Sequence, residues 1–312
     1  MTGGSFKIRN FSDQDFDRYV QLRVEAEQLA PEGRFVSARS LSDALGHPKF
    51  KAQRDLWVAE MKEILVGCLS IQREPEIGRA LLSGCVHPDH RRKKIGTKLL
   101  SAALAQIKAA GIKSAQVSIG QTHSGAKKML IHSGFSFIRN FFEMQLAISR
   151  LRLPAIREAN ISSRRLLPGE VSLLTQIQNR CFAGSWGFNA NTEEEIAYRL
   201  KMQGRSSQDV ILTYLGEHPI GYCWTLINSE ENKGSKKNKG LIHMLGVDPD
   251  FRRQDVGKAI LINGLADLKA RGVDIVELTV DCENSAARAL YESVGFEMVA
   301  KTEWYEKLLN SA

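Results

Sequence analysis

Two basic turns could bind an anion, and each joins an apolar strand to a helix. The second runs from Gly246 through Arg252 and Arg253 to Gly257, and a similar turn lies within residues 86–100. A strand-to-helix junction directs unpaired backbone N–H groups at one point, and the arginines add positive charge there. We therefore predict that each half of the chain carries a turn suited to a phosphate-bearing ligand.

The two turns belong to two copies of one sequence plan. Five pairs of positions differ by 161, namely Val86 and Val247, Gly96 and Gly257, Gly111 and Gly272, Gly134 and Gly295, and Phe135 and Phe296. Upstream, Gly67 and Gly221 differ by 154, which leaves seven extra residues in the second copy. We place them in Asn228–Gly240, whose polar composition predicts an exposed hairpin loop.

Hydrophobic periodicity and turn residues predict alternating strands and helices in both copies. In the first, we expect strands at Phe6–Arg9, Leu56–Glu60, Ile64–Ile71, Ala80–Val86, Ser114–Ile119 and two within Gly134–Ala147, and helices from Ser12 to Ala30, Ile95–Ala110 and Ser124–His132. In the second, we expect strands at Arg164–Leu167, Val210–Leu215, Ile220–Ile227, Leu241–Val247, Ile275–Val280 and closing strands after them, and helices at Gly169–Cys181, from Thr192, up to Arg271 and at Ser285–Val294. This order predicts two α/β domains, each a mixed central sheet flanked by helices, at 1–150 and 155–312, with a boundary within Leu151–Asn160.

Composition limits the function classes. With 312 residues, 43% of them apolar, the chain is long enough for two globular domains. Its net charge is +8, and residues 1–150 hold 23 Lys+Arg against 14 Asp+Glu, or +9. We attribute this to a solvated basic face and one phosphate site and consider nucleic acid an unlikely partner, because no aromatic residues interleave with the basic ones.

The sequence gives no indication of secretion, of a membrane span, of disulfide bonds or of a metal site. No leader or membrane-spanning stretch is visible, so we expect a cytoplasmic protein. Five cysteines without a Cys-x-x-Cys pair indicate reduced thiols, and the seven histidines form no ligand-spaced cluster, so we predict no metal site. The oligomeric state is left open.

The motif order resembles the GNAT acetyltransferase superfamily, twice in one chain. The motifs are a strand, an Arg-x-x-x-x-Gly turn, a helix, a strand, an Asn-x-x-Ala-x-x-x-Tyr helix and Gly-Phe, the last two within Val280–Phe296. The tandem layout and that stretch resemble the mycothiol synthase branch. The resemblance implies acetyl-CoA as the acetyl donor, with its pantetheine between two splayed strands and its pyrophosphate on the basic turn.

The resemblance also implies a set of cofactor-binding residues. In the second copy they are Leu245, Gly246, Val247, Arg252, Arg253, Gln254, Asp255, Val256, Gly257, Lys258, Asn284, Ala287 and Tyr291. In the first copy they are Val86, Arg91, Arg92, Lys93, Lys94, Ile95, Gly96 and Thr97. Backbone N–H groups around Leu245–Val247 are expected to stabilise an oxyanion.

Tyr291 and His243 are the candidate catalytic residues. By its place in the motif, Tyr291 would donate a hydrogen bond to the leaving thiolate, although its ring could instead pack on the sheet. Proton transfer from a tyrosine of pKa ~10 to a thiolate of pKa ~8.5 is uphill, so a hydrogen bond describes the role better. His243 shares a strand face with Leu241, where the branch tends to carry Glu, and could act as the base or be a half-buried strand histidine.

Both copies depart from the motif of the turn. Lys94 and Asp255 stand where the family has glycine, and we expect Asp255 to compete with a phosphate for the N–H groups of the helix start. At the other end of the site, Leu130 stands at the position of Tyr291 and His123 at that of Asn284. The first domain is therefore predicted to be non-catalytic.

The acceptor is expected beside the first two helices of the second domain. Candidate lining residues are Trp186, Phe188, Tyr222 and Trp224, although most such aromatics belong to cores. The leading hypothesis is an N-acetyltransferase acting on a primary amine of a small molecule that is amino-acid-like or aminosugar-linked. The alternatives are a non-catalytic CoA-binding sensor or scaffold, and an acetyltransferase directed at proteins or the ribosome.

Overall fold

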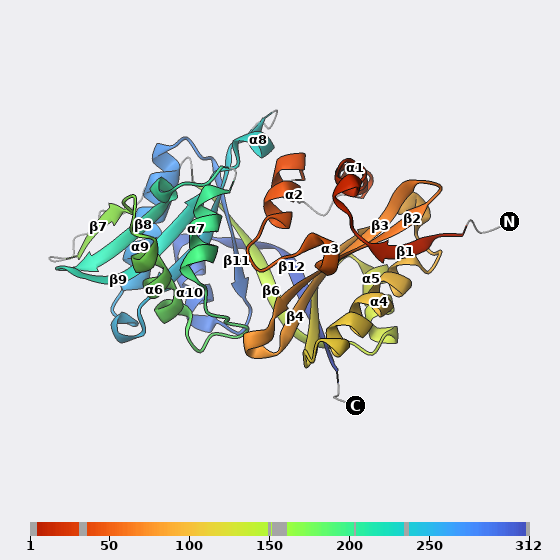
Figure 1. Cartoon of the computed structure of the whole chain (residues 1–312). Coiled ribbons are helices and arrows are strands. Elements are labelled where there is room, and N and C mark those ends of the chain that lie inside the picture. The colour runs from red at the N-terminus through yellow and green to blue at the C-terminus, as the bar shows by residue number, and fades with distance from the viewer. Residues whose placement is uncertain are drawn as a thin grey trace. The chain divides into compact units, whose positions relative to one another are not determined.

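Two units with six strands each organise the chain in the computed structural model, which describes residues 5–30, 36–148, 151, 161–202, 204–233 and 237–309. The chain divides into a first unit, Met1–Asn140 with Thr302–Ala312, and a second unit, Phe141–Lys301 (Figure 1). The predicted ranges 1–150 and 155–312 follow the order of the chain, whereas these units do not. Residues 152–160, most of the predicted boundary, lie outside the described residues.

The first unit has the sheet order β1-β2-β3-β4-β5-β12. Its strands are β1 (Lys7–Asn10), β2 (Leu56–Met61), β3 (Ile64–Glu74), β4 (Arg79–Val86), β5 (Ser114–Gly120) and residues 302–308 of β12 (Glu297–Leu308). The helices are α1 (Phe16–Leu29), α2 (Ala38–Leu45), α3 (Ala52–Asp55), α4 (Ile95–Ala109) and α5 (Ser124–His132), with short 3-10 turns η1 (Asp13–Asp15), η2 (Pro75–Ile77) and η3 (Pro88–His90). Figure 1 shows α1 and α2 on one face of this sheet and α4 and α5 on the other.

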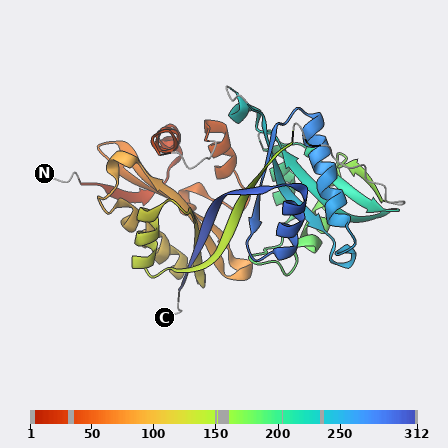
Figure 2. The same cartoon turned by 180° about the vertical axis from the view of Figure 1, so that it is seen from behind.

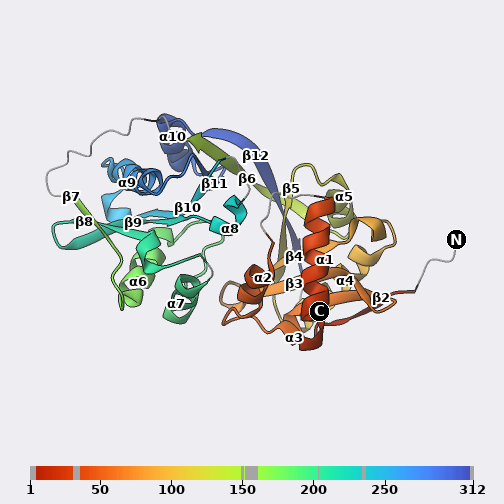
Figure 3. The same cartoon turned by 90° about the horizontal axis from the view of Figure 1, so that it is seen from above.

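The second unit has the sheet order β6-β11-β10-β9-β8-β7. Its strands are residues 141–147 of β6 (Ser136–Ala147), β11 (Ile275–Asp281), β10 (Lys239–Val247), β9 (His218–Leu226), β8 (Val210–Leu215) and β7 (Ile161–Arg165). The helices are α6 (Val171–Phe182), α7 (Glu193–Lys201), α8 (Ser229–Asn232), α9 (Val256–Ala270) and α10 (Ser285–Val294), with 3-10 turns η4 (Ser207–Asp209) and η5 (Pro249–Phe251). Viewed from above, α9 and α10 cover one face of this sheet and α6 and α7 the other (Figure 3).

Each unit takes its final strand from a distant part of the chain. Residues 302–308 of β12 pair antiparallel with β5, and residues 141–147 of β6 pair antiparallel with β11. Figure 2 shows β6 and β12 as long strands. We predicted two strands within Gly134–Ala147 and more than one closing strand in the second half, and this was wrong, because each stretch forms one strand. No glycine or proline interrupts residues 136–147 or 297–308, so nothing forces a turn there.

The mixed α/β fold predicted for both copies is confirmed. In the first unit β4 and β5 are parallel, in the second β10 and β11 are parallel, and the other pairings within the units are antiparallel. The duplication also appears in the register, because Gly67 pairs with Val86 and Gly221 pairs with Val247. For a residue of β3 paired with a residue of β4, the equivalent pair in the second unit therefore has numbers higher by 154 and 161, respectively.

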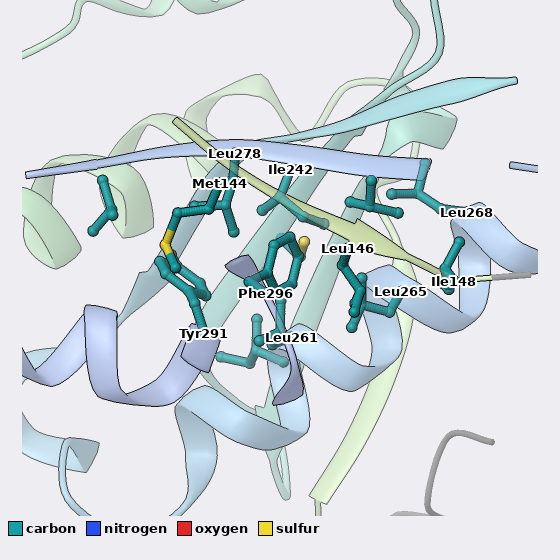
Figure 4. Packing of buried hydrophobic residues seen from close by; sticks show 14 of the residues in the cluster. Met144, Leu146, Ile148, Ile242, Leu261, Leu265, Leu268, Leu278, Tyr291 and Phe296 are labelled. Atoms are coloured by element: carbon teal, nitrogen blue, oxygen red, sulfur yellow. The ribbon is translucent and has the colours of Figure 1, made fainter. Parts of the chain in front are cut away.

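In the core of the second unit, helices α9 and α10 pack against strand β6. Leu261, Leu265 and Leu268 of α9 pack in one cluster with Tyr291 and Phe296, and with Met144 and Leu146 of β6 and Ile148 just after it (Figure 4). Burying aliphatic side chains of this size stabilises the fold by about 1.5–3 kcal/mol each. Residues 144–148 thus belong to the core of the second unit.

Candidate functional site

Two parallel strands of the second unit separate and open a gap in the sheet. Strand β10 pairs with β11 only from Lys239 to Leu241, opposite residues 275–277. Beyond that point, β11 continues beside β6, while β10 continues beside β9 to Val247. Backbone N–H and C=O groups that face the gap from β10 have no strand partner, so they are available to an extended ligand.

A β-bulge lies at the point where β10 leaves β11. The register with β9 shifts between Ile242 and Met244, so His243 is the extra residue. A bulge redirects the strand and alters the direction of its backbone groups. The N–H groups of Leu245 and its neighbours, which we expected to stabilise an oxyanion, therefore lie just after the bulge, on the part of β10 that borders the gap.

The basic turn after β10 has an unusual backbone. Arg253 and Asp255 adopt positive φ angles of 61° and 57°, with Gln254 between them, and helix α9 begins directly afterwards at Val256. Alternation of this kind points successive N–H groups into one concave surface, which binds anions. Gln254 and Lys258 are exposed. A Cβ atom at Gly257 would lie at an ordinary van der Waals distance from Leu290 and Val247.

Arg252 holds the turn in place. Its Nε donates to the Val247 carbonyl at 3.3 Å, and its terminal nitrogen donates to the Cys181 carbonyl at 2.7 Å. The guanidinium thus ties the turn to the end of β10 and to α6, a role that we did not expect for a residue predicted to bind the cofactor. Arg253 is exposed and provides a cation at the same turn.

Asp255 does not act as we expected. It is the N-cap residue of α9, but its left-handed conformation forms no side-chain cap hydrogen bond. Competition with a phosphate for the same N–H groups is therefore wrong as a mechanism. The negative charge beside the helix start remains, and it opposes an anionic ligand electrostatically.

Replacement of Asp255 by asparagine should tighten acetyl-CoA binding about three- to tenfold, because it removes an electrostatic repulsion of roughly 1 kcal/mol between the carboxylate and the phosphates. Asn tolerates a positive φ, so the backbone should be retained. Lys94→Gln is the matched control, since Lys94 occupies the equivalent position with φ of 62° but carries the opposite charge. Calorimetric titration measures both, and weaker binding by Asp255→Asn would contradict the electrostatic argument.

Tyr291 and Asn284 stand on α10 beside this region. Asn284 is the N-cap, and its side chain accepts a hydrogen bond from the Ala287 N–H at 3.1 Å. Tyr291 is 7% exposed, its ring packs edge-on against Phe296, and Figure 4 shows it close to Met144. Burial raises the pKa of Tyr291, so its hydroxyl stays protonated and remains a hydrogen-bond donor.

The first unit repeats the gap without these side chains. Strand β4 pairs with β5 only up to Leu82, and the turn that follows repeats the positive φ angles at Arg92 and Lys94. Arg91 donates to the Val86 carbonyl at 3.3 Å, as Arg252 does to Val247. Of the other candidate residues in this turn, Lys93 and Thr97 are exposed, Gly96 is half-buried and Ile95 is buried.

The aromatic candidates of the second unit fall into two groups. Trp186 and Phe188 are half-buried in the loop after α6, where Trp186 packs against Phe141 at 5.8 Å between ring centroids. Tyr222 and Trp224 are fully buried on β9 in the cluster that contacts α6. Positive φ angles at Gly184 and Gly187 give the loop its turns.

Three polar atoms, two in this cluster and one on the neighbouring face of α6, have no hydrogen-bond partner among the described residues. The Tyr222 hydroxyl, Trp224 Nε1 and Gln178 Oε1 are buried and form no hydrogen bond with any described residue. Gln178 lies on α6 on the face that carries Leu174 and Cys181, and it is 1% exposed. Buried polar atoms without a partner are costly, so such a group indicates a place for bound water or ligand. We did not predict Gln178, although a single amide on an apolar helix face was a visible signal.

His243 lies at the edge of this group. Its ring meets Trp224 edge-on at 5.6 Å between centroids. Burial and the charges of Arg205 and Arg199 lower the pKa of His243 to about 3. The imidazole is therefore neutral at pH 7 but a weak base, so it is better suited to accept a hydrogen bond than to take a proton from an ammonium group.

The described residues contain neither a membrane-spanning helix nor a cluster of metal ligands. None of the helices there is long and apolar enough to cross a membrane. No group of three or more His, Cys, Asp or Glu side chains in the same ranges is arranged to hold a metal ion.

Comparisons with known proteins match both units. The model of the acetyltransferase (GNAT) family matches residues 172–296, and that of the acetyltransferase (GNAT) domain matches residues 52–136. A mycothiol acetyltransferase of Streptomyces coelicolor is 28% identical over 234 residues, which cover 74% of this chain and 72% of that protein. Another from Stackebrandtia nassauensis is 25% identical over 306 residues, covering 93% and 98%.

Solved structures show the same fold. A GCN5-related N-acetyltransferase from Sphaerobacter thermophilus has a TM-score of 0.73 at 18% identity, covering 97% of this chain and 95% of that one. A tandem GNAT protein from the clavulanic acid biosynthesis pathway has a TM-score of 0.73 at 16% identity, covering 99% and 100%.

Proposed function

Because this chain belongs to the GNAT acetyltransferase family, with two domains of that family in tandem, and is an N-acetyltransferase that uses acetyl-CoA, we propose that it acetylates a primary amine of a small polar molecule in its second unit. The acceptor is amino-acid-like or aminosugar-linked. The observation that carries this proposal is the set of unpartnered polar atoms at Gln178, Tyr222 and Trp224.

The second unit fits the cofactor better than the first. It has the gap between β10 and β11, the concave turn at Arg253 and Asp255, and Tyr291 on the helix that follows. The first unit has the gap and the turn, but Leu130, 2% exposed, lies at the position of Tyr291. A leucine cannot donate a hydrogen bond, so we assign the chemistry to the second unit.

Each part of the site would contribute one function. When bound, acetyl-CoA supplies an acetyl group as a thioester. The turn from Arg253 to Lys258 would hold the phosphates, while backbone N–H groups of β10 near Leu245 would donate to an oxygen that gains negative charge. Tyr291 would donate a hydrogen bond to the departing sulfur, and its raised pKa keeps that proton in place.

The acceptor would lie on the α6 side of β10. Gln178 and the Tyr222 hydroxyl can each accept a hydrogen bond, and Trp224 Nε1 donates one. His243, neutral at pH 7, adds an acceptor beside Trp224. A polar acceptor would satisfy these atoms, whereas an alkyl amine would leave them without partners.

The name of the relatives supports a small-molecule acceptor. The curated relatives with 25% and 28% identity are mycothiol acetyltransferases. Family membership favours an enzyme over the non-catalytic sensor considered from the sequence.

An acceptor screen tests the proposal. Release of CoA thiol is measured with amino-acid amides and amino sugars, and with alkyl amines of similar length. Polar acceptors should give kcat/KM values at least tenfold higher, since each unpaired buried polar group costs about 1–3 kcal/mol. Gln178→Leu should raise KM for the best polar acceptor and leave an alkyl amine unaffected. Equal kcat/KM values for the two acceptor classes would refute the polar pocket.

A further inference from the structure

Two cysteines face each other in the first unit. Cys68 on β3 and Cys85 on β4 are directly paired in the antiparallel register, and their sulfur atoms are 3.7 Å apart. Directly opposite residues of antiparallel strands have Cα atoms about 4.5–5.5 Å apart, a separation that a disulfide can bridge. Rotation of the side chains is therefore sufficient to join the two sulfurs without moving the strands.

The neighbouring backbone keeps the strands together at this point. A side chain at Gly84 would come within 2.2 Å of the Cys68 carbonyl oxygen, so β4 approaches β3 as closely as glycine permits. Cys68 is 2% exposed and packs with Leu22 and Val58, whereas Cys85 is half-buried. The pair thus has one inner thiol and one outer thiol.

A cation lies next to the pair. Arg23 on α1 donates to the Tyr19 hydroxyl at 3.2 Å, and in the described part of the chain it forms no ion pair with a carboxylate. A hydrogen bond from Cys85, followed by the charge of Arg23, lowers the pKa of the Cys68 thiol against the effect of burial. Nearby positive charge favours the thiolate, which is the reactive form of cysteine.

The outer thiol is open to a small cavity. This cavity has a volume of about 30 Å³ and is lined by Arg23, Glu27, Ser83, Cys85 and Arg91, among others. A volume of this size holds about two water molecules, and Cys85 is itself only half-buried. Cys68 does not line the cavity and is reached through Cys85.

The second unit lacks this arrangement. The positions equivalent to Cys68 and Cys85, at offsets of 154 and 161, are Tyr222 and Gly246, and these two residues also pair directly. Tyr222 and Gly246 belong to the acetyl-transfer site proposed above. The thiol pair thus occupies, in the unit without Tyr291, the place of acetyl-transfer residues.

We propose that Cys68 and Cys85 form a thiol–disulfide exchange site, in which low-molecular-weight disulfides react at the half-buried outer thiol of Cys85 beside Arg23. The Cys68 thiolate accepts the proton of Cys85 through their contact, and the Cys85 sulfur attacks one sulfur of the small disulfide, whose S–S bond breaks and releases one thiolate, which takes a proton from water. The Cys68 sulfur then attacks Cys85 Sγ, its proton passes to the leaving sulfur, and the second thiol departs. The two cysteines lose two electrons and two protons, and the small disulfide becomes two thiols.

The test uses the full reduced chain and oxidised glutathione. After alkylation of the remaining thiols and digestion with trypsin, mass spectrometry should find peptides 63–73 and 80–91 joined by a disulfide. Cys282, half-buried and without a neighbouring thiol, is the internal control and should carry only a mixed disulfide. Cys68→Ser should accumulate glutathione on Cys85, because the second step is blocked.

Arg23→Met should slow formation of the link on the order of tenfold, through loss of the cation that favours the thiolate. Arg23→Lys keeps the charge and should react at nearly the original rate, as should Lys108→Met at an exposed position of the same unit. Circular dichroism verifies that each variant is folded. Glutathione that persists on Cys85 in the unmodified chain, or a link that forms only in denaturant, would overturn the proposal.

Discussion

Tyr291→Phe should lower kcat by about 10- to 100-fold, because a hydrogen bond to a charged group contributes roughly 1.5–3 kcal/mol. The ring stays in its packing against Phe296, so the free energy of unfolding and the KM for acetyl-CoA should change little. Steady-state kinetics with the best acceptor of the screen measures the effect. A loss confined to kcat is the signature of a contact that forms as the thiolate leaves.

Tyr305→Phe is the matched control for this substitution. Tyr305 is 1% exposed in the first unit, and its hydroxyl donates to Glu303 at 2.7 Å. The same atom is removed from a buried tyrosine, but outside the proposed site, so kcat should be retained. Equal turnover by the Tyr291 variant and the unmodified chain would leave Tyr291 with a packing role alone.

Gly246→Ala should destabilise the chain by about 1–3 kcal/mol, as overpacking of a core does. A Cβ atom at Gly246 would lie 2.7 Å from Cys181 Cβ and 2.8 Å from the Tyr222 ring, so β10 must move away from α6. Displacement of the N–H groups by even a fraction of an ångström weakens their contact with an oxyanion, and kcat/KM should fall at least tenfold.

Gly257→Ala is the stability control for Gly246→Ala. Its nearest neighbours would be 3.5 Å from the new Cβ, and the position lies within α9, where alanine is favoured by about 1 kcal/mol. Thermal unfolding should therefore show a lower Tm for the variant at position 246 and an unchanged or higher Tm at position 257. Identical melting of the two variants would contradict the close approach of α6 to β10.

Much of the fold could be predicted because its signals are local. The capping boxes at Ser12 and Thr192 form as expected, each with its acidic partner three residues later. Glycines repeated at an offset of 161 revealed the duplication, and the register of both sheets confirms it. The choice of β6 and β12 as partners for strands in distant parts of the chain has no local signal, since alternation describes one strand and not its neighbour.

The site was less accessible to sequence reasoning. A turn that favours glycine keeps its left-handed backbone at Lys94 and Asp255, because the strand before it and the helix after it determine its path. The bonds of Arg252 to two carbonyls, and the lack of a partner for Gln178 Oε1, depend on which elements pack together. The thiol pair depends on register, which places residues 17 positions apart opposite each other.

Because β12 pairs with β5 from the far end of the chain, the first unit cannot complete its sheet until synthesis of the protein ends. A ribosome completes every residue of Phe141–Lys301 before it adds the segment that pairs with β5. Until then, the nascent first unit exposes β5 as an open edge, which can pair with other chains. Separate expression of residues 1–150 and 155–312 would make that exposure permanent, since each fragment lacks the strand that closes its sheet. Maturation of the first unit is therefore coupled to completion of the second.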